Sequence, residues 1–150
     1  DAQLRAPESL TVHDDLVYVA DMCNHRIQVY QLSDGRHVRS IGRTGQAPDF
    51  GDDEEGADIW ATFDGDERIG SAPGEFNEPW GVAIGHGRLY VSEREGRRIQ
   101  VLTLEGEPLH VIASPDGKSL GGLCVDGFRV WVTGPHILRD SFVHLLELAD

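Results

Sequence analysis

The chain has 150 residues, 39% of them hydrophobic and 26% charged, which suits one domain with a hydrophobic core and argues against global disorder. Its 13 basic and 26 acidic residues give a formal charge of −13, which opposes nucleic acid or an anionic membrane as a partner, since both require a positive surface. No apolar run approaches the roughly 18–20 residues of a membrane-spanning helix.

Four short strands are predicted at the start of the chain. The segment PESLTVHDDLVYVADMCNHRIQVYQL, Pro7–Leu32, contains three runs in which apolar residues recur at strand spacing. Asp34-Gly35 then separates the third run from Val38–Ile41. Asp-Gly between two such runs favours a β-hairpin, because glycine tolerates the positive φ of a tight turn.

An acidic segment follows these strands. Residues 46–67 carry nine acidic residues and no Lys or Arg, so the rest of the chain has 17 acidic and 13 basic residues. The sequences on either side, SIGRTG (Ser40–Gly45) and RIGSAPG (Arg68–Gly74), resemble each other. We therefore interpret about 46–69 as an insertion between two repeats, with Ile59–Phe63 as a candidate strand.

The first segment is repeated later in the chain. PWGVAIGHGRLYVSEREGRRIQVLTL, Pro79–Leu104, has eight identities in 26 ungapped positions, and RIQV occurs in both copies at the same place. Leu109–Ile112 is the predicted fourth strand of this copy. A fainter third copy reads GGLCVDGFRVWVTG from Gly121 and FVHLLEL from Phe142. Repeats of four short antiparallel strands indicate the blades of a β-propeller.

The repeat, with a Pro-x-Gly-Val-Ala start in the second copy and with a Tyr-Val pair and NHRIQV or GRRIQV in both, resembles the NHL repeat family. This resemblance implies an all-β partial β-propeller of about three four-stranded antiparallel blades, the last incomplete, with an acidic inserted loop. The predicted boundaries are about 4–45, 70–114 and 119–150 for the blades and about 46–69 for the insert. Three blades are too few to close a ring of about four to eight. The open blade ends therefore predict self-association.

The resemblance also implies a recurring buried pair in each blade. It is formed by Asp21 with Arg26 in the first copy and by Glu93 with Arg98 in the second. A planar guanidinium suits this structural brace because it can bind a carboxylate with two hydrogen bonds. The alternative makes His25 a ligand or a base. Repetition favours the brace, since a catalytic group is needed once and a brace is needed in every blade.

Two further groups are candidate contact sites. Trp80 follows the proline of the second copy and should lie near the start of an innermost strand, where the end surface of a propeller binds partners. Trp131 aligns with Tyr18 and Tyr90 and is interpreted as blade packing.

The second group is acidic and consists of Asp52, Asp53, Glu54 and Glu55. These residues could bind a basic partner, but a solvated loop is the simpler interpretation. No calcium site is predicted in this segment, because Asp64 and Asp66 are followed by Arg68 and the ligand order of an EF-hand is absent.

The function predicted first is a non-catalytic scaffold for a protein partner, built from NHL repeats within a larger propeller. The alternative is part of a six-bladed propeller enzyme, such as a metal-dependent lactonase, hydrolase or lyase. The innermost strands offer no set of ligands, so we predict no metal and no cofactor. A third hypothesis, RNA binding, is opposed by the charge of −13. The two cysteines have no paired spacing, which is compatible with a reducing compartment such as the cytoplasm.

Overall fold

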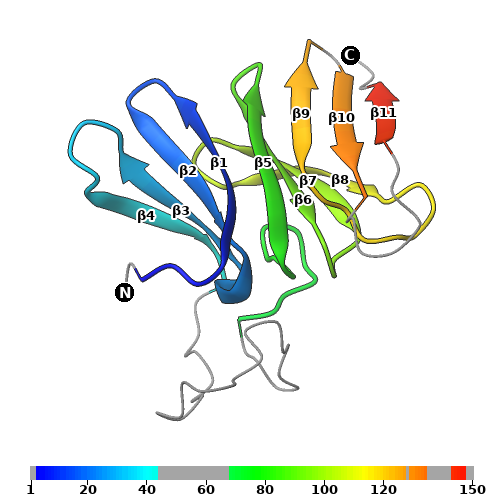
Figure 1. Cartoon of the computed structure of the whole chain (residues 1–150), viewed down its shortest axis with the longest axis horizontal. Helices are drawn as coiled ribbons and strands as arrows, with labels where there is room; N and C mark the ends of the chain where they lie inside the picture. Colours follow the sequence, from blue (N-terminus) through cyan, green and yellow to red (C-terminus); the bar gives the residue numbers. More distant parts are fainter. Residues whose placement is uncertain (1–2, 44–67, 128, 135–142, 148–150) are drawn as a thin grey trace.

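The computed structural model describes residues 3–43, 68–127, 129–134 and 143–147, and these form three antiparallel β-sheets side by side (Figure 1). The described part contains no α-helix and therefore no helix that could cross a membrane. The predicted fold class, an all-β partial propeller with an incomplete last blade, is confirmed. The predicted blade boundaries stay predictions. The predicted insert, with the candidate strand Ile59–Phe63, lies outside the described residues apart from residues 68 and 69.

Blade 1 is a sheet of four strands in the order β1-β2-β3-β4. Its strands are β1 (Pro7–His13), β2 (Leu16–Asp21), β3 (Arg26–Gln31) and β4 (His37–Gly42), with a single 3₁₀ turn, η1 (Met22–Asn24), between β2 and β3. The predicted Asp-Gly turn lies between β3 and β4, where Gly35 has φ +70°.

Blade 2 repeats this sheet in the order β5-β6-β7-β8. Its strands are β5 (Pro79–Gly85), β6 (Arg88–Glu93), β7 (Arg98–Thr103) and β8 (Pro108–Ala113). The two RIQV segments open β3 and β7, which occupy the same place in successive sheets. The sequence repeat is therefore a repeat of whole blades.

Blade 3 has three described strands, in the order β11-β10-β9. They are β9 (Leu123–Asp126), β10 (Arg129–Thr133) and β11 (Val143–Glu147).

The blades pack face to face, with the innermost strands β1, β5 and β9 next to one another (Figure 1). We call the side of a blade that faces the preceding blade its leading face, and the opposite side its trailing face. Tyr18, Ile27 and Val29 on the trailing face of blade 1 share one core with Val82 and Leu89 on the leading face of blade 2. A second core joins the trailing face of blade 2 to blade 3. Its buried residues are Tyr90, Ile99, Val101, Leu120, Val130 and Val132.

Polar contacts and a glycine help the blades to approach each other. The backbone N–H of Val82 donates to Ser9 Oγ at 2.9 Å, and Arg39 Nη2 donates to the carbonyl oxygen of Leu104 at 2.6 Å. A Cβ on Gly81 would lie 2.8 Å from the carbonyl oxygen of Gly121. Only glycine therefore allows the backbones of blades 2 and 3 to come this close.

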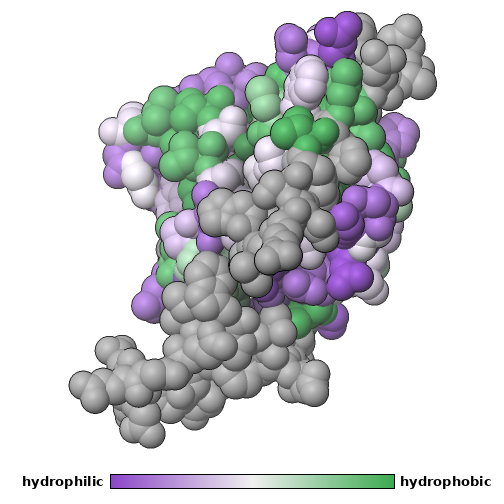
Figure 2. Space-filling view, turned by 45° about the vertical axis from the view of Figure 1, so that its right-hand side comes forward, coloured by the Kyte–Doolittle hydropathy of each residue, from purple (hydrophilic) through white to green (hydrophobic). Residues whose placement is uncertain are grey.

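The two outer faces of the arc remain uncovered by described residues. Leu10 on the leading face of blade 1 is 63% exposed, whereas Val82, its counterpart in the second copy, is 4% exposed because blade 1 covers it. Hydrophobic residues reach the surface over the upper part of the molecule, on both sides of the view (Figure 2). Trp131, which was interpreted as blade packing, is 40% exposed, while Tyr18 and Tyr90 are 1% exposed. Trp131 lies on the trailing face of blade 3, against which no described blade packs.

Face-to-face packing predicts unequal costs for the same substitution within blade 2. Leu89 is fully buried in the first core and Leu109 on β8 is 42% exposed. We expect Leu89→Ala to lower the free energy of unfolding by about 2–5 kcal/mol, through lost burial and a cavity. Leu109→Ala should change it by less than about 0.5 kcal/mol. Urea denaturation of both variants measures the difference, and equal effects would contradict the assignment of the core.

Candidate functional site

One end of the arc brings together loops of blades 1 and 2, and we call it the end surface. Backbone hydrogen bonds run here from Cys23 N to Arg5 O, from Arg94 N to Glu78 O and from Gly96 N to Asn77 O. They tie the loop after the second strand of each blade to the chain that enters its first strand. The backbone repeats closely: φ is positive at Ala6 and His25 and, at the equivalent positions of the second copy, at Glu78 and Arg97. Residues other than glycine rarely adopt such a conformation, so both blades share a specific loop structure.

A buried carboxylate organises this loop in blade 1. Asp21 is fully buried and lies opposite Arg26 in the register of β2 and β3. It accepts hydrogen bonds from Arg26 Nε at 2.8 Å, Asn24 Nδ2 at 2.8 Å and the backbone N–H of Arg5 at 2.7 Å. One side chain thus contacts two strands and the chain that enters β1.

Glu93 occupies the equivalent position in blade 2 and is also fully buried. It accepts from Arg98 Nε at 2.7 Å, Gln100 Nε2 at 2.7 Å and the backbone N–H of Asn77 at 2.8 Å. Burial raises the pKa of Glu93 above its ordinary value of 4.5, and these three donors oppose the rise. Two of the three contacts of Asp21 are repeated although the acid differs, because Arg98 and Asn77 take the places in the second copy that Arg26 and Arg5 have in the first.

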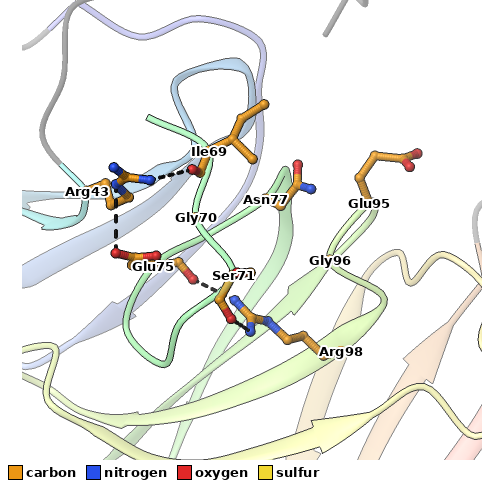
Figure 3. A pocket seen from close by; sticks show the side chains of 9 residues that line it. All are labelled: Arg43, Ile69, Gly70, Ser71, Glu75, Asn77, Glu95, Gly96 and Arg98. Atoms are coloured by element: carbon orange, nitrogen blue, oxygen red, sulfur yellow. Dashed lines mark hydrogen bonds and ion pairs between the residues drawn. The ribbon is translucent and has the colours of Figure 1, made fainter. Parts of the chain in front are cut away.

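A polar pocket of about 330 Å³ opens on the end surface between these loops (Figure 3). Arg43 donates from Nη1 to the carbonyl oxygen of Ile69 at 2.9 Å, and its Nε lies 3.7 Å from Glu75 Oε1. Arg98 donates to the carbonyl oxygens of Ser71 and, at 2.8 Å, of Glu75. The pocket is lined by Arg43, Ile69, Gly70, Ser71, Glu75, Asn77, Glu95, Gly96 and Arg98. Its two guanidinium groups thus already have protein partners.

A second group on the end surface combines an indole, a guanidinium and a buried carboxylate. The Arg94 guanidinium carbon lies 5.7 Å from the centroid of the Trp80 ring, and Arg94 Nε lies 2.7 Å from Glu78 Oε2. Arg94 Nε also lies 3.5 Å from Oε1 of Glu95, which lines the pocket. The backbone N–H of Glu78 donates to His25 Nδ1 at 3.0 Å. We call Trp80, Arg94 and Glu78 the Trp80 cluster; Glu95 connects it to the pocket.

The Trp80 cluster departs from the repeat. The first copy has Glu8, Met22 and Ala6 at the positions equivalent to Trp80, Arg94 and Glu78. Burial raises the pKa of Glu78 above its ordinary value of 4.5; Glu95 adds to the rise and Arg94 opposes it. Blade 1 forms the same loops without these three side chains, so the blade architecture does not require them.

Of the predicted contact residues, the structure describes Trp80 but not the acidic candidates. Trp80 lies near the start of β5 and is half-buried, on the end surface. The acidic candidates Asp52, Asp53, Glu54 and Glu55 lie outside the described residues. Sequence reasoning missed Glu78 and Arg94. The sequence contained a signal for both residues, because they stand at positions where the two copies differ in chemical type. Within the described ranges, no three His, Cys, Asp or Glu side chains are grouped so that they could hold a metal ion.

Comparison with known proteins identifies the repeats. The model of the NHL repeat matches residues 4–30 and 76–102, which confirms the resemblance for the first two of the three predicted copies. No curated protein matches the sequence.

Solved structures share the fold. Hydrazine synthase of Kuenenia stuttgartiensis aligns with 96% of this chain at a TM-score of 0.63 and 12% identity. A protein of Bacteroides fragilis NCTC 9343 aligns with 88% of it at a TM-score of 0.58 and 14% identity. The chain spans 33% and 31% of the length of these two structures. At such low identity the similarity concerns the fold alone.

The carboxylate networks predict a loss of stability when the guanidinium is removed. We expect Arg26→Ala to lower the free energy of unfolding by about 3 kcal/mol, because Asp21 would keep a buried charge without its cation. Arg98→Ala should have a similar effect through Glu93. Thermal melts monitored by circular dichroism measure both, with Arg88→Ala, at an exposed position, as the matched control. Melting temperatures equal to that of the control would contradict the structural brace.

The raised pKa of Glu78 predicts a specific pH dependence. The folded protein holds the Glu78 proton more tightly than the unfolded chain, so ionisation favours unfolding as pH rises from about 4.5 through the folded pKa. Compared with Glu78→Gln, the wild type should be relatively most stable below this range and lose that advantage above it. The difference between the melting temperatures of the two proteins, measured against pH, tests this, and a difference independent of pH would contradict the assignment.

Proposed function

We propose that the chain is part of a non-catalytic β-propeller that binds a protein partner through the end surface, with the Trp80 cluster as the main contact. The observation that carries the proposal is that the Arg94 guanidinium contacts both the Trp80 ring and the buried Glu78 carboxylate. Trp and Arg are the residues most enriched where binding energy concentrates in protein interfaces. Their absence from the same positions of blade 1 gives them a role other than building a blade.

The geometry of the end surface supports an extended segment as the bound element. Glu95 connects the pocket to the Trp80 cluster, so the two form one polar surface with a large aromatic side chain. A peptide could place an apolar or cationic side chain on the indole face and polar backbone groups at the pocket. The acidic residues Asp52, Asp53, Glu54 and Glu55 are proposed as a second contact for a basic partner, with a mainly electrostatic contribution to the rate of association.

A selection of peptides from a random display library on the immobilised chain tests this proposal. We expect Trp80→Ala to raise the Kd of the selected peptides by about tenfold or more, because truncation of a central Trp typically removes about 2 kcal/mol or more. Trp80→Phe should preserve part of the affinity. Trp131→Ala is the matched control, because Trp131 is a partly exposed Trp on another surface, and it should leave Kd unchanged.

Equal affinity for Trp80→Ala and the wild type, with unchanged melting temperatures, would contradict the end surface as the binding site. Elemental mass spectrometry of the purified chain separates the scaffold from the enzyme alternative. Zinc or calcium bound at one equivalent would favour the metal-dependent enzyme.

A further inference from the structure

The leading face of blade 1 has the residue pattern of a face that another blade covers. Leu10 and Val12 on this face are 63% and 48% exposed. Their counterparts in the second copy, Val82 and Ile84, pack in the core between blades 1 and 2. The same sheet position is therefore covered in blade 2 and uncovered in blade 1.

The trailing face of blade 3 has the complementary pattern. Trp131 pairs directly with Leu145 across β10 and β11, so both side chains lie on one face, where they are 40% and 42% exposed. In the alignment of the repeats they correspond to Tyr18 and Val29, which are buried on the trailing face of blade 1 against blade 2. Val143, 65% exposed, takes the place of Ile27 on the same face.

One chain thus displays both halves of an interface that it already forms internally. We propose that two copies associate head to tail, with the trailing face of blade 3 of each copy on the leading face of blade 1 of the other. Trp131 and Leu145 would cover Leu10 and Val12, as Tyr18 and Val29 cover Val82 and Ile84. The proposal is independent of the function assigned to the end surface, because it uses other residues.

Geometry identifies a second copy as the occupant. A contact between two different faces of one chain is heterologous and closes into a ring when the rotation between copies allows it. The three sheets fan around their inner strands (Figure 1), and two copies bring six blades, within the range of about four to eight in which propellers close.

Sedimentation equilibrium of the 150-residue chain over a concentration series tests the proposal. We expect a monomer–dimer equilibrium for the wild type. Leu10→Asp and Leu145→Asp should each raise the dissociation constant by more than about tenfold, because each places a charge in a dry interface. Leu109→Asp is the matched control: Leu109 is 42% exposed, like Leu145, and lies on β8, outside both faces, so the dimer should persist.

Mixing the two disrupted variants distinguishes a head-to-tail contact from other dimers. In the mixed dimer one interface joins two unsubstituted faces, so dimer should reappear in the mixture although each variant alone is monomeric. Circular dichroism melts of both variants at low concentration should match the wild type, because both leucines are exposed in the monomer. A monomeric wild type, oligomers larger than a dimer, a dimer that resists both substitutions, or a mixture that stays monomeric would each overturn the proposal.

Discussion

The structure depends on one constraint: each sheet has two apolar faces, and a face is buried only when another sheet covers it. Between blades 1 and 2 this burial is achieved by Tyr18, Ile27 and Val29 against Val82 and Leu89. Hydrogen bonds between the blades, such as that from Val82 N to Ser9 Oγ, add direction to a contact that is otherwise hydrophobic. The polar networks at the end surface then determine how the loops of each blade are held.

Much of the fold could be predicted from the sequence, because strand spacing and turn chemistry are local properties. The RIQV repeat placed β3 and β7 at the same position of successive blades, and the Asp34-Gly35 turn lies where the sequence indicated. The environment of Trp131 could not be predicted in this way. Alignment gives the position of a residue within its blade, whereas its burial depends on whether a neighbouring blade covers that face.

The same limit applies to the candidate site: the acid–arginine pairs that both copies share could be predicted from the sequence, whereas two residues present in one copy were missed. The pairs Asp21–Arg26 and Glu93–Arg98 could be predicted because the resemblance implied them and the first two copies share them, and their side chains do form close ion pairs. Glu78 and Arg94 occur in one copy only, so a search for shared residues passes over them. Their relation to Trp80 becomes visible in three dimensions, where the loop before β5 meets the loop after β6. In a repeat protein, the differences between copies are therefore as informative as the identities when a binding site is sought.

The hydrogen bond from the backbone N–H of Asn77 to Glu93 has a consequence for how such a chain can change over evolution. It holds the chain that enters blade 2 against Glu93, which belongs to the same blade and follows the connection from blade 1 in the sequence. The connection can then gain or lose residues without moving the point at which the next sheet starts. We therefore expect this connection to accept insertions of different length and charge, and with them new recognition loops, with little loss of folding stability.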